Sequence, residues 1–348
     1  MKTESQSPTA PGITSGEDYL RQKREQLDRI YCDEVDGCLS IKPEHQHFGC
    51  PYCNTSDCLP YNNPLVSKGL HFVRCRTCQL VYPLPRLSSN SLNARVDAPI
   101  LNKYYAYRHN QRMARVSSSM GKNVVEPIPK EFRRELGFIS RWSKADASEA
   151  PKALEVGCGD GQFLGCLAGL GYLSRGVEPN SATAAFAQSC GLDVFNGLFQ
   201  PGLPFPPHAF DLIAMRETLY HFYDLSAAMK LARGLLADEG LLYIKSFNVD
   251  SFAIRRFARA SGGINGLDIP CNFSPISLKY ILKDSGFEIL DTVYFPEQPL
   301  GEYLIKWDLV QSLFFRYPKG ALNRIISGLL IKLGKSRNFA VMARKTQL

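Results

Sequence analysis

Four cysteines of this chain are spaced as two metal-binding turns. Cys50 and Cys53 form one C-x-x-C pair and Cys75 and Cys78 form a second, with 21 residues between the pairs. Each pair can present two thiolates from one tight turn, and two such turns complete a tetrahedral site. Because four protein ligands leave no position for water or substrate, the spacing predicts a structural zinc site. The tandem arrangement disfavours redox use of a single pair.

A glycine-rich turn follows a short apolar run in the stretch ALEVGCGDGQFL, residues 153–164. Gly157, Gly159 and Gly161 alternate where a strand is expected to pass into a helix, which is the context of a nucleotide site. The turn is not a phosphate-binding P-loop, because no Gly-Lys-Ser/Thr follows it. Gln162 stands where the dinucleotide fingerprint has its third glycine, and this weakens a nicotinamide or flavin interpretation.

An acidic residue ends the next predicted strand. Glu178 closes the stretch GVE, 23 residues after Glu155. A carboxylate at the tip of a second strand can accept hydrogen bonds from both ribose hydroxyls of an adenosine cofactor. The alternative is a surface glutamate before a proline turn, and the placement favours the ribose role.

Strands and helices that position these residues alternate from residue 151 onward. Strands are predicted in KALEVGC, LSRGVEP, LDVFNG, FDLIAMR, GLLYIKSF, FEILDTVYF and NFAVMAR. Helices are predicted between them in GQFLGCLAGLG, SATAAFAQSCG, LSAAMKLARGLLADEG and SPISLKYILKDSG. The predicted fold class is α/β, with a Rossmann-like, mostly parallel seven-stranded sheet, helices on both faces and a small N-terminal zinc ribbon. Such sheets bind ligands at the carboxyl ends of their strands.

Composition and spacing divide the chain into five expected segments. They are a disordered segment at 1–16, a helical lead-in at 17–43, the zinc ribbon at 44–85, a helical linker or lid at 86–131, and a main domain at 132–348 with an insertion at about 301–335.

Charge, cysteine content and hydropathy indicate the expected partners and cellular compartment. The formal net charge of +8 is scattered, which favours a solvated surface over a nucleic-acid footprint. Eleven cysteines, an odd number, without an apolar signal region at the N-terminus predict free thiols in a reducing cytoplasm. No apolar run reaches the roughly 18 residues of a membrane span.

The stretches ALEVGCGDGQFL, GVEPN and FDLIAMRETLYHFYDL, in this order, resemble the class I S-adenosylmethionine-dependent methyltransferases. LLYIKSFNVDS and NFSPISLKYILKDSGFEIL extend the resemblance over roughly residues 132–348. The segment CPYC…RCRTCQLVYPLPR is similar to the N-terminal zinc-binding segment of a bacterial subgroup from sugar, cell-surface polysaccharide and secondary-metabolite pathways.

The resemblance implies that S-adenosylmethionine binds at the glycine turn. Glu155 would help anchor the methionine end of the cofactor, and Glu178 would bind the ribose. Glycines would allow close backbone approach, and residues after the third strand would border the adenine. The implied cofactor-binding residues are Glu155, Gly157, Gly159, Gly161, Glu178, Asn196 and Gly197.

Acceptor chemistry is expected after the fourth strand, in LYHFYDL. His221 is the main candidate for a base or acceptor-binding group, and Glu217 would line the same pocket. A structural role for His221 is the alternative. Relatives usually have Leu-Glu-His here, and Tyr220 replaces that glutamate. The histidine that relatives often have before the late Phe-Ser is also missing, since residues 255–275 contain none.

The sequence therefore predicts a zinc-containing methyltransferase that acts on a small molecule, such as a nucleotide-linked sugar or a natural-product intermediate. O-methylation is favoured over C- or N-methylation. The alternatives are a methyltransferase for RNA or protein with the ribbon as substrate reader, a non-catalytic binding protein on the same fold, and a dehydrogenase. The apolar, basic insertion at 301–335 is expected to cover the sheet or form a homodimer face, or else to lie on a membrane surface.

Overall fold

The computed structural model describes residues 49–61, 71–84, 86, 128–142, 149–255, 269–296 and 319–346. The segments predicted at 1–16 and 17–43, and most of the linker predicted at 86–131, lie outside these residues.

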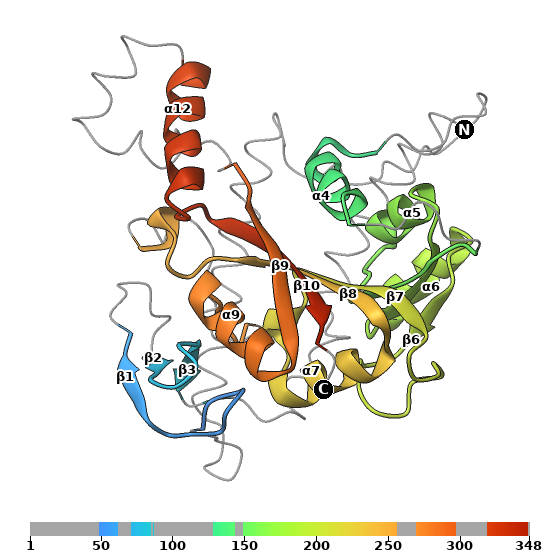
Figure 1. Cartoon of the computed structure of the whole chain (residues 1–348), viewed down its shortest axis with the longest axis horizontal. Coiled ribbons are helices and arrows are strands. Elements are labelled where there is room, and N and C mark those ends of the chain that lie inside the picture. Colours follow the sequence, from blue (N-terminus) through green and yellow to red (C-terminus); the bar gives the residue numbers. More distant parts are fainter. Residues whose placement is uncertain are drawn as a thin grey trace, which may run out of the picture.

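A seven-stranded sheet forms the centre of the molecule (Figure 1). Its spatial order is β6-β5-β4-β7-β8-β10-β9. The first five strands in this order are parallel, and β10 pairs antiparallel with both of its neighbours. The strands are β4 (Lys152–Val156), β5 (Leu173–Glu178), β6 (Val194–Asn196), β7 (Phe210–Arg216), β8 (Leu236–Phe247), β9 (Phe287–Tyr294) and β10 (Asn338–Lys345). The predicted fold class is confirmed.

Helices cover both faces of this sheet, because successive strand residues alternate between two cores. On β7, Leu212 and Ala214 pack with α4 and α5, whereas Ile213 and Met215 pack with α7 and α9. The helical elements are α4 (Lys130–Ser140), α5 (Gln162–Gly169), α6 (Ser181–Ser189), the short 3-10 turn η2 (Leu219–His221), α7 (Leu225–Leu235), α9 (Pro275–Asp284) and α12 (Lys319–Lys332). Among the described residues, no helix is both long and apolar enough to span a bilayer.

Side-chain caps explain where two of these helices begin. The Asp224 carboxylate accepts a hydrogen bond from the Ala227 amide at 2.9 Å and starts α7. Ser274 and Ser277 form a reciprocal capping box at the start of α9. The C-terminal end of α7 differs from the prediction, which extended the helix through LADEG. The helix ends at Leu235, because Leu236 already pairs with Phe210 as the first residue of β8.

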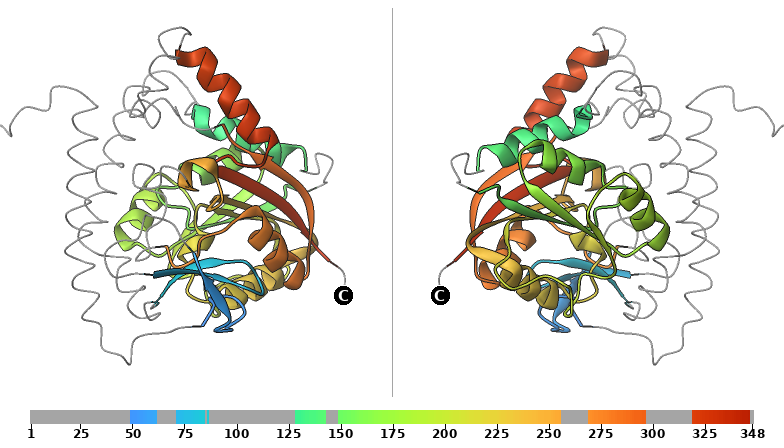
Figure 2. Two further views of the ribbon diagram at one scale, coloured as in Figure 1. Left: turned by 90° about the vertical axis from the view of Figure 1, so that its left-hand side faces the viewer. Right: turned by 90° about the vertical axis from the view of Figure 1, so that its right-hand side faces the viewer.

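The cysteine segment folds as a separate antiparallel sheet with the order β1-β2-β3. Its strands are β1 (Cys58–Pro60), β2 (His71–Cys75) and β3 (Val81–Leu84). All three strands lie within residues 44–85, the segment in which the zinc ribbon was expected. Figures 1 and 2 place these strands, drawn in blue, next to α7 and α9. We call this sheet with its two cysteine turns, residues 49–86, the ribbon.

Candidate active site and metal centre

The glycine turn between β4 and α5 has a left-handed backbone at each of its three glycines. The φ angles are +70° at Gly157, +56° at Gly159 and +75° at Gly161, values that favour glycine. A Cβ atom on Gly157 would lie 2.5 Å from the Thr218 hydroxyl oxygen, and one on Gly161 would collide with Leu192. A Cβ atom on Gly159 would meet no atom within 4 Å. The turn therefore packs tightly at Gly157 and Gly161 and is open at Gly159, where a ligand can approach the backbone.

Glu178 is fixed beside this open position at the carboxyl end of β5. One carboxylate oxygen accepts a hydrogen bond from the Gly159 amide at 2.9 Å, and the other accepts from the Asn180 amide at 2.8 Å. The side chain is almost fully buried. These contacts hold the carboxylate next to the place where a ligand would meet Gly159.

The predicted adenine-side residues lie at the end of β6. The Asn196 amide nitrogen donates to the Glu178 carbonyl at 2.9 Å, and the Gly197 N–H donates to the same carbonyl at 3.1 Å. A side chain on Gly197 would run into the Phe195 ring, whose nearest atom lies 2.5 Å from the added Cβ. Both residues thus fix the ends of two neighbouring strands relative to each other.

Glu155 is a buried carboxyl group on β4 with an unsatisfied oxygen. Its Oε2 atom makes no hydrogen bond within the described part of the chain. Burial raises the pKa of Glu155 well above its usual value, although the nearby Arg216 charge opposes this shift. Buried polar atoms in native proteins almost always have a partner. An ammonium or hydroxyl donor of a ligand would satisfy Oε2, and S-adenosylmethionine carries both kinds of group, so the residues present fit that cofactor.

A buried ion-pair cluster lies beside the site and was not predicted from the sequence. The Glu135 side chain on α4 is 0% exposed. It accepts hydrogen bonds from Arg216 at 2.9 and 3.2 Å, from the Lys245 ammonium at 2.7 Å and from the Tyr243 hydroxyl at 3.0 Å. Both carboxylate oxygens are therefore satisfied by charged or polar donors from β7 and β8.

Glu217 and His221 follow β7 at the carboxyl edge of the sheet. Glu217 has a left-handed backbone with a φ of +56°, and its carboxylate lies 3.1 Å from the Lys245 ammonium. Although burial opposes ionisation, the charges of Lys245 and Arg216 lower the pKa of Glu217. A carboxylate with a lowered pKa is a weak general base. His221 lies on the surface at the end of η2, so it remains the stronger candidate for proton transfer.

The four predicted metal ligands lie together in the ribbon. The Sγ atoms of Cys50, Cys53, Cys75 and Cys78 are all within 4.8 Å of one another. The Cys50–Cys78 and Cys53–Cys75 sulfur pairs are both 3.5 Å apart. Tetrahedral zinc with bonds of about 2.3 Å requires sulfur separations of about 3.8 Å, so small shifts of the four sulfur atoms would make the cluster fit zinc.

The two cysteine turns have matching backbone geometry. The Asn54 amide donates to the Cys50 carbonyl at 3.0 Å, and the Gln79 amide donates to the Cys75 carbonyl at 3.1 Å. Asn54 and Gln79 each follow the second cysteine of a pair and have φ angles of +54° and +61°. This repeated conformation directs two thiols from each turn toward a common centre.

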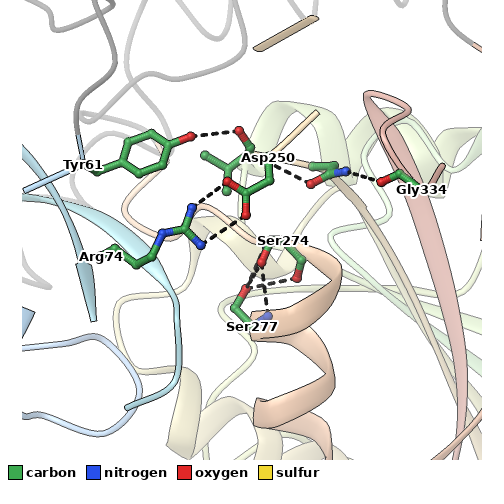
Figure 3. Close-up of polar contacts among 8 residues, drawn as sticks. Tyr61, Arg74, Asp250, Ser274, Ser277 and Gly334 are labelled. Carbon is green, nitrogen blue, oxygen red and sulfur yellow. Dashed lines mark hydrogen bonds and ion pairs between the residues drawn. The ribbon is translucent and has the colours of Figure 1, made fainter. Parts of the chain in front are cut away.

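The ribbon is joined to the main domain by a partly buried polar contact (Figure 3). Arg74 precedes the ligand Cys75 and donates to both carboxylate oxygens of Asp250, at 2.6 and 3.1 Å. The Tyr61 hydroxyl donates to the Val249 carbonyl at 2.9 Å. Residues 249 and 250 follow β8 directly, so this contact lies at the carboxyl edge of the sheet.

Further contacts bind the ribbon to the neighbouring segments of that edge. Arg86, with 5% of its surface exposed, donates to the Gly49 carbonyl at 2.7 Å and to the Tyr223 carbonyl at 2.6 Å. Val81 and Asn272 exchange two backbone hydrogen bonds of 3.1 and 2.8 Å. The ribbon thus contacts the segments that follow β7 and β8 and the segment before α9.

Replacing Arg74 with alanine is expected to lower the free energy of unfolding by about 1–2 kcal/mol. Asp250 would lose both donors, and its side chain is only 16% exposed. Arg76 provides a matched control, because its ion pair with Asp57 joins side chains that are 55% and 64% exposed. Arg76→Ala should cost at most about 0.5 kcal/mol. Chemical denaturation measures both values, and equal effects would contradict a specific role of the Arg74 contact.

About half of the chain is similar to known proteins. Residues 126–292 match the family model described as a methyltransferase domain. An uncharacterised protein of Mycobacterium tuberculosis strain H37Rv is 30% identical over 165 residues, which cover 46% of this chain and 54% of that protein. A Mycobacterium bovis protein gives the same values. The chain thus spans about half the length of the curated relatives it matches.

Solved structures of similar chains were also found. A methyltransferase from Archaeoglobus fulgidus that depends on S-adenosylmethionine has a TM-score of 0.43 and 19% identity, and covers 62% of this chain and 91% of its own. A possible histamine N-methyltransferase from Thermotoga maritima has a TM-score of 0.41 and 20% identity, with coverages of 62% and 98%. The fold assignment rests on the strand order of this chain, and its residues 126–292 are similar to a methyltransferase domain. The predicted resemblance is supported at the level of this domain match.

Proposed function

We propose that the protein transfers a methyl group from S-adenosylmethionine to a small-molecule acceptor. The observation that carries the proposal is the carboxylate of Glu178, held at the open side of the Gly159 turn within the matched methyltransferase domain. When bound, the cofactor supplies a methyl group activated by a positively charged sulfur.

Each residue of the site has a proposed role in binding. Glu178 accepts hydrogen bonds from the ribose hydroxyls, and Glu155 accepts one from the ammonium of the methionine part through its unsatisfied oxygen. Asn196 and Gly197 border the adenine. Gly159 allows close approach of the cofactor to the backbone. Catalysis then consists largely of positioning the acceptor in line with the methyl group.

His221 is the proposed base for an oxygen acceptor. It lies exposed after β7, at the sheet edge where ligands of this fold class bind. Its imidazole would remove the acceptor proton as the new bond to carbon forms. Glu217 would help to orient the acceptor, since its lowered pKa keeps it ionised beside Lys245.

The state of the ribbon arginines supports a small acceptor over RNA or protein. Arg74 pairs with Asp250, Arg76 pairs with Asp57, and Arg86 donates to backbone carbonyls. Arg74 and Arg76 are thus paired with carboxylates and Arg86 is only 5% exposed, whereas a nucleic-acid reader needs cations that are available to phosphates. We propose that the ribbon binds zinc for stability, with a nucleotide-linked sugar or natural-product intermediate as the acceptor.

Calorimetric titration with S-adenosylmethionine tests the cofactor site. Glu178→Gln removes the negative charge and replaces one acceptor oxygen with an NH2 donor. We therefore expect the affinity for S-adenosylmethionine to fall about 10- to 100-fold. Asp193→Asn is the control, because Asp193 is 59% exposed and its carboxylate pairs with Arg175, which is not part of the glycine turn. An unchanged affinity of Glu178→Gln would reject this site. Stabilisation by NAD instead of S-adenosylmethionine would favour a dehydrogenase.

A transfer assay tests the acceptor class. The protein is incubated with methyl-labelled cofactor and an extract of the source cells, and the products are separated by size. Label in the small-molecule fraction supports the proposal, and mass spectrometry then identifies the acceptor. Label in RNA or protein would make the ribbon a substrate reader. Cofactor binding without label in any fraction would favour a binding protein on the same fold.

A further inference from the structure

Helix α12 presents an apolar face to solvent. Ile325, Leu329 and Leu333, spaced four residues apart, are 69%, 56% and 60% exposed, whereas Ser327 and Leu330 on the opposite side are buried. Both views of Figure 2 show α12, in red, projecting from one end of the molecule. Large apolar side chains gathered on one exposed helix face mark an interaction site more often than scattered ones do.

Positive charge surrounds this apolar face. Arg324, Lys332 and Lys335 are exposed on or next to α12. The sequence from Leu309 to Leu348 contains eight lysines and arginines and no aspartate or glutamate. Of these, Lys345 lies on β10 and pairs with Asp238, whereas Arg324, Lys332 and Lys335 are the exposed cations at α12. An apolar helix face bordered by cations is complementary to a surface that is both apolar and anionic.

The C-terminal end of α12 is attached to the carboxyl edge of the sheet. Phe252, which is 42% exposed, donates its amide to the Lys335 carbonyl at 3.1 Å, just beyond the end of α12. The Asn248 side chain donates to the Gly334 carbonyl at 3.2 Å, a contact that is visible in Figure 3. These bonds fix the end of α12 against the segment that follows β8.

We propose that α12 docks the protein on an anionic lipid surface, with Ile325, Leu329 and Leu333 inserted at the interface and the flanking cations facing the headgroups. A second copy of the chain fits this face less well, because two such helices would bring their like charges together. A membrane crossing is excluded for α12 by its length of 14 residues. The inference concerns binding alone and does not depend on the proposed methyl transfer.

Vesicle flotation with the full chain tests this inference. We expect the protein to float with vesicles of phosphatidylglycerol and phosphatidylcholine, and to bind vesicles of phosphatidylcholine alone roughly 100-fold more weakly. Added salt should weaken the binding to anionic vesicles. Failure to float with anionic vesicles, or equal binding to both kinds, would overturn the proposal.

Matched variants locate the docking surface. The double variant Ile325→Asp with Leu329→Asp is expected to lower the binding to anionic vesicles at least about tenfold. Ile276→Asp is the control, since Ile276 is a comparably exposed isoleucine (66%) on α9. Thermal unfolding checks that both proteins are folded. Equal binding of the double variant and the wild type would overturn the proposal. A wild-type dimer that the double variant converts to monomer would also overturn it, because the face would then belong to a second copy.

Discussion

Replacing Cys75 with serine is expected to abolish zinc binding and to unfold the ribbon. Cys75 is fully buried and belongs to the cluster of four sulfur atoms. Structural zinc contributes about 10–16 kcal/mol to the folding of small zinc domains, which is as large as the whole stability of an average domain. The described strands of the ribbon comprise only three, four and five residues, so the sheet has little other stabilisation.

The measurement is zinc per chain by elemental analysis, together with hydrogen exchange of the ribbon amides. Wild type should contain about one zinc ion, and Cys75→Ser should contain little and exchange rapidly in β2 and β3. Cys58→Ser is the matched control: Cys58 is a half-buried cysteine of the same sheet but lies outside the four-sulfur cluster. If both variants keep zinc, or if both lose it, the assignment of these four ligands is wrong.

The loss of zinc should also destabilise the part of the main domain that contacts the ribbon. The backbone bonds between Val81 and Asn272 and the ion pair between Arg74 and Asp250 both start from residues adjacent to the cysteine turns. Amides at 249–252 and 271–273 are therefore expected to exchange faster in Cys75→Ser. The amides of Gly157 and Gly159 donate to Val177 and Glu178 at the end of β5, so the protection of the glycine turn and the cofactor affinity should change far less.

Local patterns in the sequence were sufficient for the features that depend on short spacing. The two C-x-x-C pairs predicted a sulfur cluster, because each pair needs only one turn to bring its thiols together. The alternation of strands and helices predicted the sheet, and the apolar runs ended close to the observed strands. The turn at Gly157, Gly159 and Gly161 is likewise a local conformation, so its positive φ angles followed from the glycines.

Long-range polar contacts were not predictable in this way. Arg74 and Asp250 are 176 positions apart, so no spacing rule connects them. The partners of the other two ribbon arginines are equally hidden from any spacing rule: Arg76 pairs with Asp57, and Arg86 donates to the Gly49 carbonyl. The end of α7 was also missed, since pairing with β7 rather than local propensity makes Leu236 a strand residue.

Glu135 illustrates a signal that a closer pattern analysis would have found. It lies three residues after Phe132 and four before Ile139, so it shares the buried face of α4 with them. A glutamate on an apolar helix face requires a cationic partner, because an unpaired buried carboxylate is strongly disfavoured. The identity of the partners, Arg216 and Lys245, was beyond the sequence, since they lie 81 and 110 positions away.

Glu135→Ala is expected to lower the free energy of unfolding by about 3–5 kcal/mol, because Arg216 loses its carboxylate partner and Lys245 is left with Glu217 alone. The Arg216 and Lys245 side chains are only 21% and 9% exposed, so water replaces few of the lost hydrogen bonds. Asp291→Ala is the control, because Asp291 is 39% exposed and its carboxylate lies 3.7 Å from Arg141. This substitution should lower the free energy of unfolding by at most about 0.5 kcal/mol. Denaturant unfolding of both variants measures the difference.

Glu135→Gln separates the charge of this residue from its shape. The amide keeps the volume and one acceptor oxygen but loses the negative charge. The free energy of unfolding of Glu135→Gln should therefore lie between those of Glu135→Ala and the wild type. The Glu135 charge also raises the pKa of the buried Glu155, and its removal should lower that pKa and favour the ionised form of Glu155. If Glu155 binds the cofactor ammonium, Glu135→Gln should bind S-adenosylmethionine at least as tightly as wild type although it is less stable. Parallel losses of stability and cofactor affinity would instead show that the cluster supports the site mainly by holding its shape.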